Sequence, residues 1–147
     1  MTKWFSLLAT TSLVACGTEP TPEITGSWSL TASYAGGTLS CTLQATLHLD
    51  GNGASIPGSL IENAASCTDA GRPIDLVPQS HTLVATLNGR SISLLPQPPP
   101  EARGCALFRY EGTLSSETMS GTVATEPDFC QGTYVQMNGS WHAERSP

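Results

Sequence analysis

Apolar residues recur at every second position over most of the chain after residue 24. The longest alternation runs from Thr38 to Leu49, with Leu, Cys and Ala in one phase and Ser, Thr, Gln and His in the other. A period of two places successive side chains on opposite faces of a strand. This segment is therefore predicted to be a strand with one buried and one solvated face. Trp28, Leu30 and Ala32 show the same alternation in the preceding segment.

Shorter alternating runs predict strands at residues 54–62, 82–87, 90–95, 105–114, 118–125 and 133–144, and a brief one around 74–77 between two prolines. Turn residues separate these runs. Asn88-Gly89 is a preferred two-residue hairpin sequence, and Asp50-Gly51-Asn52-Gly53 joins two further strands. No segment shows a helical period. The chain is therefore predicted to be all-β, an antiparallel up-and-down meander of about eight strands that forms either a closed barrel or a β-sandwich.

A Gly-x-Trp motif occurs near both ends of the predicted sheet. Gly26-Ser27-Trp28 opens the first strand, Gly139-Ser140-Trp141 lies in the last, and Arg145 follows four residues later. This arrangement resembles the calycin group of barrels (lipocalins, avidins and their small bacterial relatives), where Gly-x-Trp starts the first strand and a cation near the chain end packs over that Trp. The resemblance implies that Trp28, Trp141 and Arg145 close a barrel. A cation over an indole adds ~0.5–2 kcal/mol. In a sandwich both tryptophans would be ordinary core residues.

The first residues have the features of an export signal. A basic start at Lys3 precedes an uncharged apolar run that is too short to span a bilayer, which takes ~20 residues. The run ends in Leu13-Val14-Ala15-Cys16, which resembles the lipobox of bacterial lipoproteins. The resemblance implies a signal peptide at 1–15, a lipidated Cys16 followed by a flexible tether at 16–23, and a single domain at 24–147. Because Gly17, not Asp, follows the cysteine, it also implies delivery to the outer membrane of a cell with two membranes.

Charge excludes one class of partner. The 147 residues contain 6 Lys and Arg against 12 Asp and Glu, a formal net charge of −6, and only 12% of residues are charged. A chain of this kind cannot neutralise a row of phosphates, so nucleic acid is not expected as a partner. Anionic headgroups would also repel the domain, so contact with the membrane is expected through the lipid anchor alone.

The other four cysteines are an even number in an oxidising setting, which favours disulfides. Zinc is not expected, because there is no Cys-x-x-Cys and no histidine lies near a cysteine pair. Spacing favours Cys41–Cys67 and Cys105–Cys130, since each interval contains one hairpin turn. Folding the first hairpin at residues 51–52 puts position 62 opposite Cys41 and leaves Cys67 just beyond the strand end.

Catalytic chemistry is not visible. The histidines are His48, His81 and His142, of which His48 and His142 occupy polar-face strand positions. No Gly-x-Ser-x-Gly elbow or free thiol is present. The chain is expected to be neither an enzyme nor a holder of a metal or cofactor.

An eight-stranded barrel can enclose one small ligand, and the inward phases here are rich in Leu, Ala and Val. The predicted function is therefore that of an envelope lipoprotein that binds a small apolar ligand. The alternative is a protein-interaction or protease-inhibitor-like envelope protein that uses its loops and exterior faces. The proline-rich segment 96–101 would then be a stiff ledge for a partner.

Overall fold

The computed structural model describes residues 22–97, 107–126 and 135–147. These contain nine strands: β1 Gly26–Gly36, β2 Leu39–Leu49, β3 Ser55–Asp69, β4 Arg72–Ile74, β5 Ser80–Asn88, β6 Ser91–Pro96, β7 Phe108–Leu114, β8 Thr118–Thr125 and β9 Asn138–Arg145. The described part of the chain includes no helix long and apolar enough to cross a bilayer.

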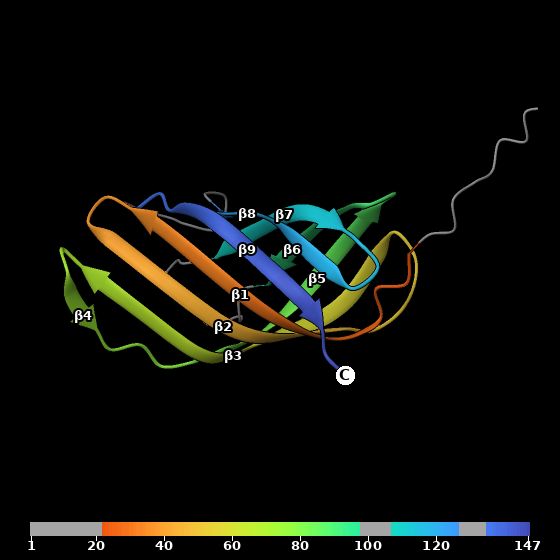
Figure 1. The fold of residues 1–147 in the computed structure, drawn as a ribbon, viewed down its shortest axis with the longest axis horizontal. Helices are drawn as coiled ribbons and strands as arrows, with labels where there is room; N and C mark the ends of the chain where they lie inside the picture. The colour runs from red at the N-terminus through yellow and green to blue at the C-terminus, as the bar shows by residue number, and fades with distance from the viewer. Residues whose placement is uncertain (1–21, 98–106, 127–134) are drawn as a thin grey trace, which may run out of the picture.

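Eight of these strands form a closed antiparallel barrel (Figure 1). Apart from the short β4, each strand pairs with the next along the chain, and β9 pairs with β1. β4 is an additional strand that pairs only with the last residues of β3. The predicted up-and-down meander and calycin-like barrel are thus confirmed. A sandwich is excluded, because the ladder of strand pairs runs round the barrel without a break.

The predicted strand limits were least accurate for β3. The expected strand 54–62 continues to Asp69, and it stays paired with β2 along its whole length. A register shift opposite Gln44 and Ala45 leaves Asn63 as an extra residue, a β-bulge. The bulge interrupts the alternation of apolar residues, which is why the pattern ended the strand too early. Similarly, the short strand expected at 74–77 lies at Arg72–Ile74.

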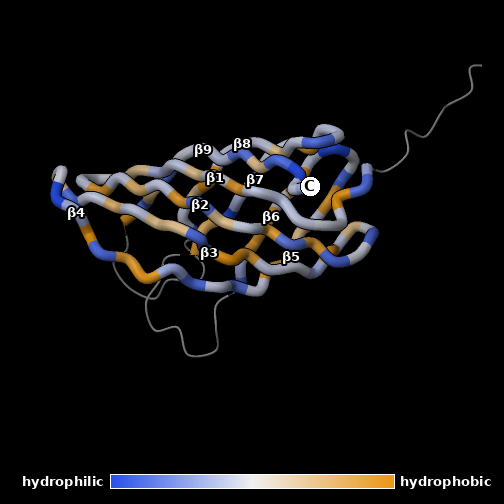
Figure 2. Tube along the Cα trace, turned by 60° about the horizontal axis from the view of Figure 1, so that its bottom comes forward, coloured by the Kyte–Doolittle hydropathy of each residue, from blue (hydrophilic) through white to orange (hydrophobic). Residues whose placement is uncertain are grey.

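The barrel interior is a continuous apolar core. Figure 2 shows hydrophobic and hydrophilic residues alternating along the strands. The inward residues form one buried cluster, which comprises Ile24, Trp28, Leu30, Ala32, Leu43, Ala45, Leu47, Leu49, Ile56, Leu60, Leu83, Ala85, Leu87, Ile92, Leu94, Tyr110, Leu114, Met119, Val123, Trp141 and Ala143. Burial of these side chains is the main favourable contribution to folding.

Two glycines make room for Trp141 inside the barrel. Gly112 of β7 and Gly121 of β8 are paired across the strands, and Trp141 of β9 is opposite Gly121. A Cβ on Gly121 would lie 1.9 Å from the carbonyl oxygen of Glu111, and one on Gly112 would lie 3.0 Å from the Trp141 ring. The Trp141 indole N–H donates to the same Glu111 carbonyl at 3.1 Å. Backbone and ring therefore approach more closely here than any side chain would allow.

One end of the barrel, here called the tryptophan end (Ile24, Trp28, Arg145), is sealed. Trp28 is fully buried, and its indole N–H donates to the Ile24 carbonyl at 3.0 Å. The Arg145 guanidinium carbon lies 4.4 Å from the centre of the Trp28 ring. Arg145 also donates to the carbonyls of Thr25 and Glu23, at 2.9 and 2.7 Å. This is the contact that the calycin resemblance implied for Trp28 and Arg145.

The opposite end, here called the disulfide end (Tyr34, Cys41, Cys67), carries the Cys41–Cys67 disulfide that the spacing predicted. The position expected for Cys67 was wrong. Cys67 does not lie beyond the strand end but directly opposite Cys41 in the β2–β3 ladder, whereas residue 62 is opposite Ala45. The connection between the strands is longer than a turn at 51–52, because β2 ends at Leu49 opposite Gly58.

Candidate functional site

The two ends of the barrel differ in how well they exclude solvent. At the tryptophan end, Ile24, Trp28 and Leu49 are at most 1% exposed. At the disulfide end, Tyr34, Ala65 and Phe108 are only half-buried, although they pack against the core. The inward-facing side chains at the disulfide end therefore keep more accessible surface than those at the tryptophan end, although Cys41, Cys67 and Met137 form a second buried cluster there. This makes that end the candidate functional site.

A carboxylate lies among these inward-facing residues. Glu62 follows Ile56 and Leu60 in the buried phase of β3 and is paired with the buried Ala45 of β2. The bulge at Asn63 comes immediately after it, and this extra residue returns the next odd-numbered residues, up to Cys67, to the interior. A single irregularity in β3 thus turns both Glu62 and Cys67 inward, which regular alternation could not do.

His81 is the imidazole neighbour of Glu62. It is paired with the buried Leu60 and continues the inward phase of Leu83 in β5. Its Nε2 lies 3.6 Å from Glu62 Oε1, and the two side chains are only 14% and 20% exposed. The other carboxylate oxygen accepts the backbone N–H of Gln79 at 3.0 Å. By contrast, His81 Nδ1 is buried without a hydrogen-bond partner. Buried polar atoms normally have a partner, so His81 Nδ1 is an exception among the described side chains.

Three aromatic side chains line the interior next to this pair. The rings of Tyr34 and Phe108 lie 4.4 Å apart between centroids, and Tyr110 packs edge-on against Trp141 at 5.9 Å. Burial raises the pKa of Tyr34 to about 12, and the charge of Glu62 adds to this shift. Burial, with smaller contributions from Tyr34 and Glu62, also raises the pKa of Tyr110 far above its usual range. Both phenols therefore stay protonated and neutral at physiological pH.

Two arginines near the barrel ends interact elsewhere. Arg109 forms an ion pair with the buried Glu126 at 2.5 Å, and Arg145 is engaged at the tryptophan end. Among the described residues, the inward-facing groups at the disulfide end, here called the chamber, thus combine apolar and aromatic side chains with the Glu62 carboxylate and the His81 imidazole. Such a lining suits non-covalent binding of a small molecule. Within the described ranges, no three His, Cys, Asp or Glu side chains are grouped so that they could hold a metal ion.

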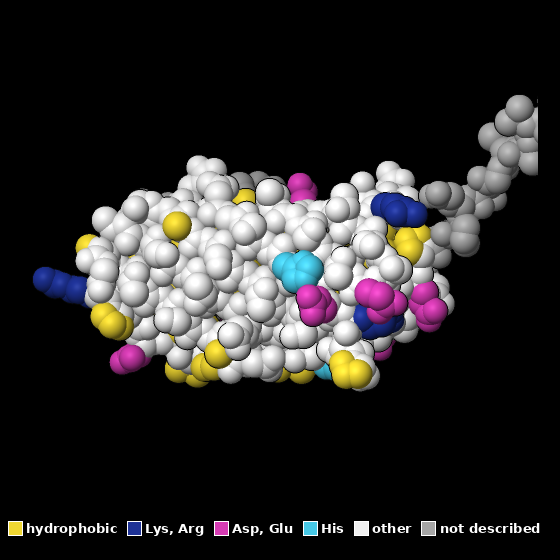
Figure 3. Space-filling view, viewed as in Figure 1, with side chains coloured by type: hydrophobic (Ala, Val, Ile, Leu, Met, Phe, Trp, Pro, Cys, Tyr) yellow, Lys and Arg dark blue, Asp and Glu magenta, His cyan; other side chains and the backbone are white. Residues whose placement is uncertain are grey.

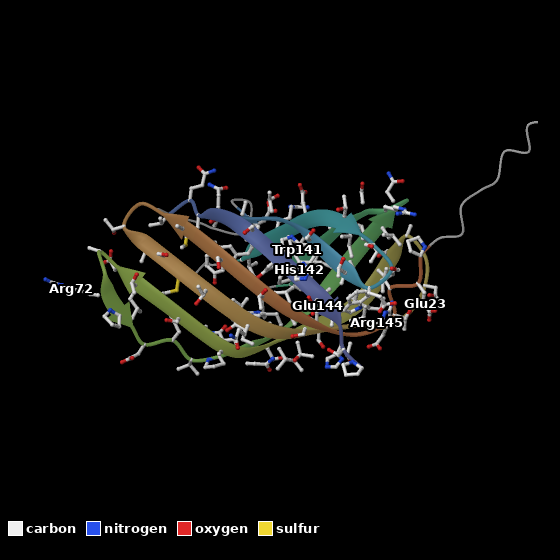
Figure 4. All side chains as sticks on the ribbon, in the orientation of Figure 1. Glu23, Arg72, Trp141, His142, Glu144 and Arg145 are labelled. Atoms are coloured by element: carbon white, nitrogen blue, oxygen red, sulfur yellow. A yellow bond between two sulfur atoms is a disulfide. The ribbon has the colours of Figure 1, made fainter. Side chains whose placement is uncertain are left out.

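The predicted polar-face histidines lie on the outside of the barrel. His48 is hydrogen-bonded to Ser27 through Nδ1 at 2.8 Å, and His142 lies 3.1 Å from Glu144. Figure 4 labels His142 on β9, and Figure 3, in the same orientation, shows a face that is mostly neither charged nor hydrophobic. These residues do not reach the chamber.

Of the predicted site residues, the structure brings Trp28 and Arg145 together at one end and joins Cys41 to Cys67 at the other. Trp141 is buried within the barrel, not at its rim, and packs against Tyr110. The predicted lipid site Cys16 and the predicted pair Cys105–Cys130 lie outside the described residues.

Glu62 and His81 were missed by the sequence analysis, although a signal was present. Glu62 is in phase with the apolar Ile56 and Leu60, and His81 is in phase with Leu83 and Ala85. A charged or titratable residue that continues the buried phase of a strand is a candidate for a functional site, because burying it costs free energy unless it has a partner.

Comparisons of the chain with models of protein families, with curated protein sequences and with solved structures each found no match. The site is therefore interpreted from its own geometry.

Proposed function

We propose that this protein is a lipid-anchored envelope lipoprotein that binds a small, largely apolar molecule inside its barrel, without catalysing a reaction on it. The observation that carries the proposal is the contrast between the sealed tryptophan end and the half-buried inward-facing residues Tyr34, Ala65 and Phe108 at the other. A concave apolar lining with a few polar groups is typical of small-molecule sites.

The lipid anchor and the binding site would lie at opposite ends of the domain. Glu23 accepts a hydrogen bond from Arg145 at the tryptophan end, and Figure 4 shows the two side by side. From Cys16 to Glu23 the chain can extend by at most ~25 Å. We therefore infer that the tryptophan end faces the membrane and the disulfide end faces away from it, towards the aqueous compartment. Delivery to the outer membrane stays part of this proposal for a cell with two membranes.

The binding proposal is tested with two matched substitutions on adjacent residues of β3. Ala65 faces the interior and is half-buried, whereas Ala64 is exposed. Ala65→Trp should fill the chamber entrance, and Ala64→Trp should add the same side chain outside. Full-length protein purified from envelopes would be analysed by native mass spectrometry. The expected result is a bound small molecule in wild type and Ala64→Trp but not in Ala65→Trp. Wild-type protein without any bound molecule, or equal occupancy in both variants, would contradict the proposal.

The anchor is tested separately by growing cells that express the protein with a labelled fatty acid. Wild-type protein should carry the label and Cys16→Ser should not. Unlabelled wild-type protein would show that residues 1–15 are not followed by a lipid anchor.

A second candidate function is supported by one exposed apolar stretch. Exposed apolar side chains lie close together at the end of β4 and just after it, at Ile74, Leu76 and Val77. Val77 is 81% exposed. Exposed apolar clusters often mark contact sites for other proteins. In this alternative, a protein-interaction or inhibitor-like role, a photo-crosslinker at position 77 would capture a specific envelope protein. Replacement of 96–101 by Gly and Ser, of which residues 98–101 lie outside the described ranges, would test the predicted proline-rich ledge.

A further inference from the structure

We propose that the molecule bound at the disulfide end is a cationic amphiphile, an apolar or aromatic body with a protonated amine that pairs with Glu62. This inference rests on the proposed function, because it names the chemical class of the ligand for the same chamber.

The first argument is electrostatic. The Glu62 side chain is only 20% exposed, and it faces the interior of the barrel. Among the described residues its ion-pair contact is with His81, at 3.6 Å. That distance exceeds the ~2.7–2.9 Å of a charge-assisted hydrogen bond. A buried carboxylate is stabilised by a cation at hydrogen-bond distance. Glu62 Oε1 can accept a further hydrogen bond from such a cation.

The second argument concerns the unpartnered nitrogen of His81. If Nε2 carries the proton and points at Glu62, Nδ1 is a free acceptor. Nδ1 lies on the side of the ring away from Glu62 and is closed off from solvent, so the acceptor that a ligand would meet is Glu62 Oε1. An ammonium group has three N–H donors and no acceptor. It is therefore better suited to this lining than a carboxylate, which would place its charge beside that of Glu62.

The third argument is the aromatic lining. Tyr34 and Phe108 form a tilted pair at 4.4 Å, and Tyr110 lies behind them in the core. Aromatic faces attract cations through their quadrupole, and this attraction increases when the cation is desolvated. The phenols of Tyr34 and Tyr110 keep their protons, and the Glu62 carboxylate lies close enough to both to add to the rise in their pKa values. The overall charge of −6 also favours the approach of a cation.

The test compares three probes that share one apolar body: 2-(2-naphthyl)ethylamine, 2-(2-naphthyl)ethanol and 2-naphthylacetic acid. Binding to the full-length protein would be measured by isothermal titration calorimetry at neutral pH in one detergent buffer. Partition of each probe into the detergent would be measured without protein and the affinities corrected for it, so that the three head groups can be compared on wild type. The amine should bind wild type about tenfold more tightly than the alcohol, and the acid should bind most weakly.

Glu62→Gln removes the charge and keeps the shape. We expect it to weaken amine binding about tenfold while leaving alcohol binding within about twofold. Glu144→Gln is the matched control, because it makes the same chemical change on the outer face, where the Glu144 side chain is 70% exposed. It should leave all three affinities unchanged.

The outcomes separate the two proposals. If amine and alcohol bind wild type equally, or if Glu62→Gln leaves amine binding intact, the amine inference is overturned while ligand binding stands. If none of the three probes binds wild type, both proposals are overturned for ligands of this size. The comparison of head groups on wild type needs no variant, so the inference stays testable even if Glu62→Gln fails to fold.

Discussion

Arg145 provides the sharpest test of how the barrel is closed. Its guanidinium packs over Trp28 at 4.4 Å and donates to the carbonyls of Thr25 and Glu23. It also lies 3.8 Å from Glu117. The Arg145 side chain is 27% exposed, so its contacts are partly shielded from solvent. Arg145→Ala removes all of these contacts at once and exposes the fully buried Trp28 indole to solvent.

The expected loss follows from the environment of each contact. The cation–π contact contributes about 1 kcal/mol at a partly exposed position. The part-buried hydrogen bond from the charged guanidinium to Thr25 contributes about 1.5 kcal/mol. The bond to Glu23 and the ion pair with the 72% exposed Glu117 are solvated and contribute less than about 0.5 kcal/mol together. Arg145→Ala should therefore lower the free energy of unfolding by about 2–3 kcal/mol.

The assay is urea unfolding followed by circular dichroism. The dependence of the free energy of unfolding on urea concentration should be the same for all variants. Arg145→Lys should lose roughly half as much, because an ammonium keeps the charge over Trp28 but not the two-pronged donation. Arg72→Ala is the matched control, since Arg72 is exposed in β4 and projects away from the barrel in Figure 4. It should change stability by less than about 0.5 kcal/mol. Equal stability losses for Arg145→Ala and Arg72→Ala would refute the closure argument.

Three further outcomes are expected. Replacing Cys41 and Cys67 together by Ala should cost ~3.5 kcal/mol, the chain-entropy value for a separation of 26 residues, and should reduce the effect of reductant on unfolding to that of the predicted Cys105–Cys130 pair; a loss below about 1 kcal/mol would contradict this. Gly121→Ala should destabilise the barrel by about 1–3 kcal/mol, measured by thermal unfolding, because the new Cβ would lie 1.9 Å from the Glu111 carbonyl oxygen. Stability should fall between pH 10 and pH 12, because the unfolded chain releases the Tyr34 proton near pH 10 whereas burial raises its folded-state pKa to about 12; Tyr34→Phe should make this fall less steep but not abolish it, because burial also raises the pKa of Tyr110, and an unchanged slope would count against the assignment.

Much of the fold could be predicted because its determinants are local. Alternation in 38–49 predicts β2 to within one residue, and Asn88-Gly89 correctly predicts the hairpin between β5 and β6. The pairing of Cys41 with Cys67 was found from spacing alone, although their register was not. The alternation of β3 does not show where an extra residue such as Asn63 lies. Its position is fixed only by the pairing of β3 with β2.

The candidate site was less predictable than the fold for the same reason. Sequence determined that the chain alternates and turns, because side-chain direction in a strand depends only on the position of each residue relative to its neighbours in the chain. Tertiary structure alone decided that Glu62 and His81 lie beside each other inside the barrel, and that one end is sealed while the other admits solvent. These features depend on which strands pair, where the bulge lies and how the interior fills, and those are contacts between residues far apart in the chain.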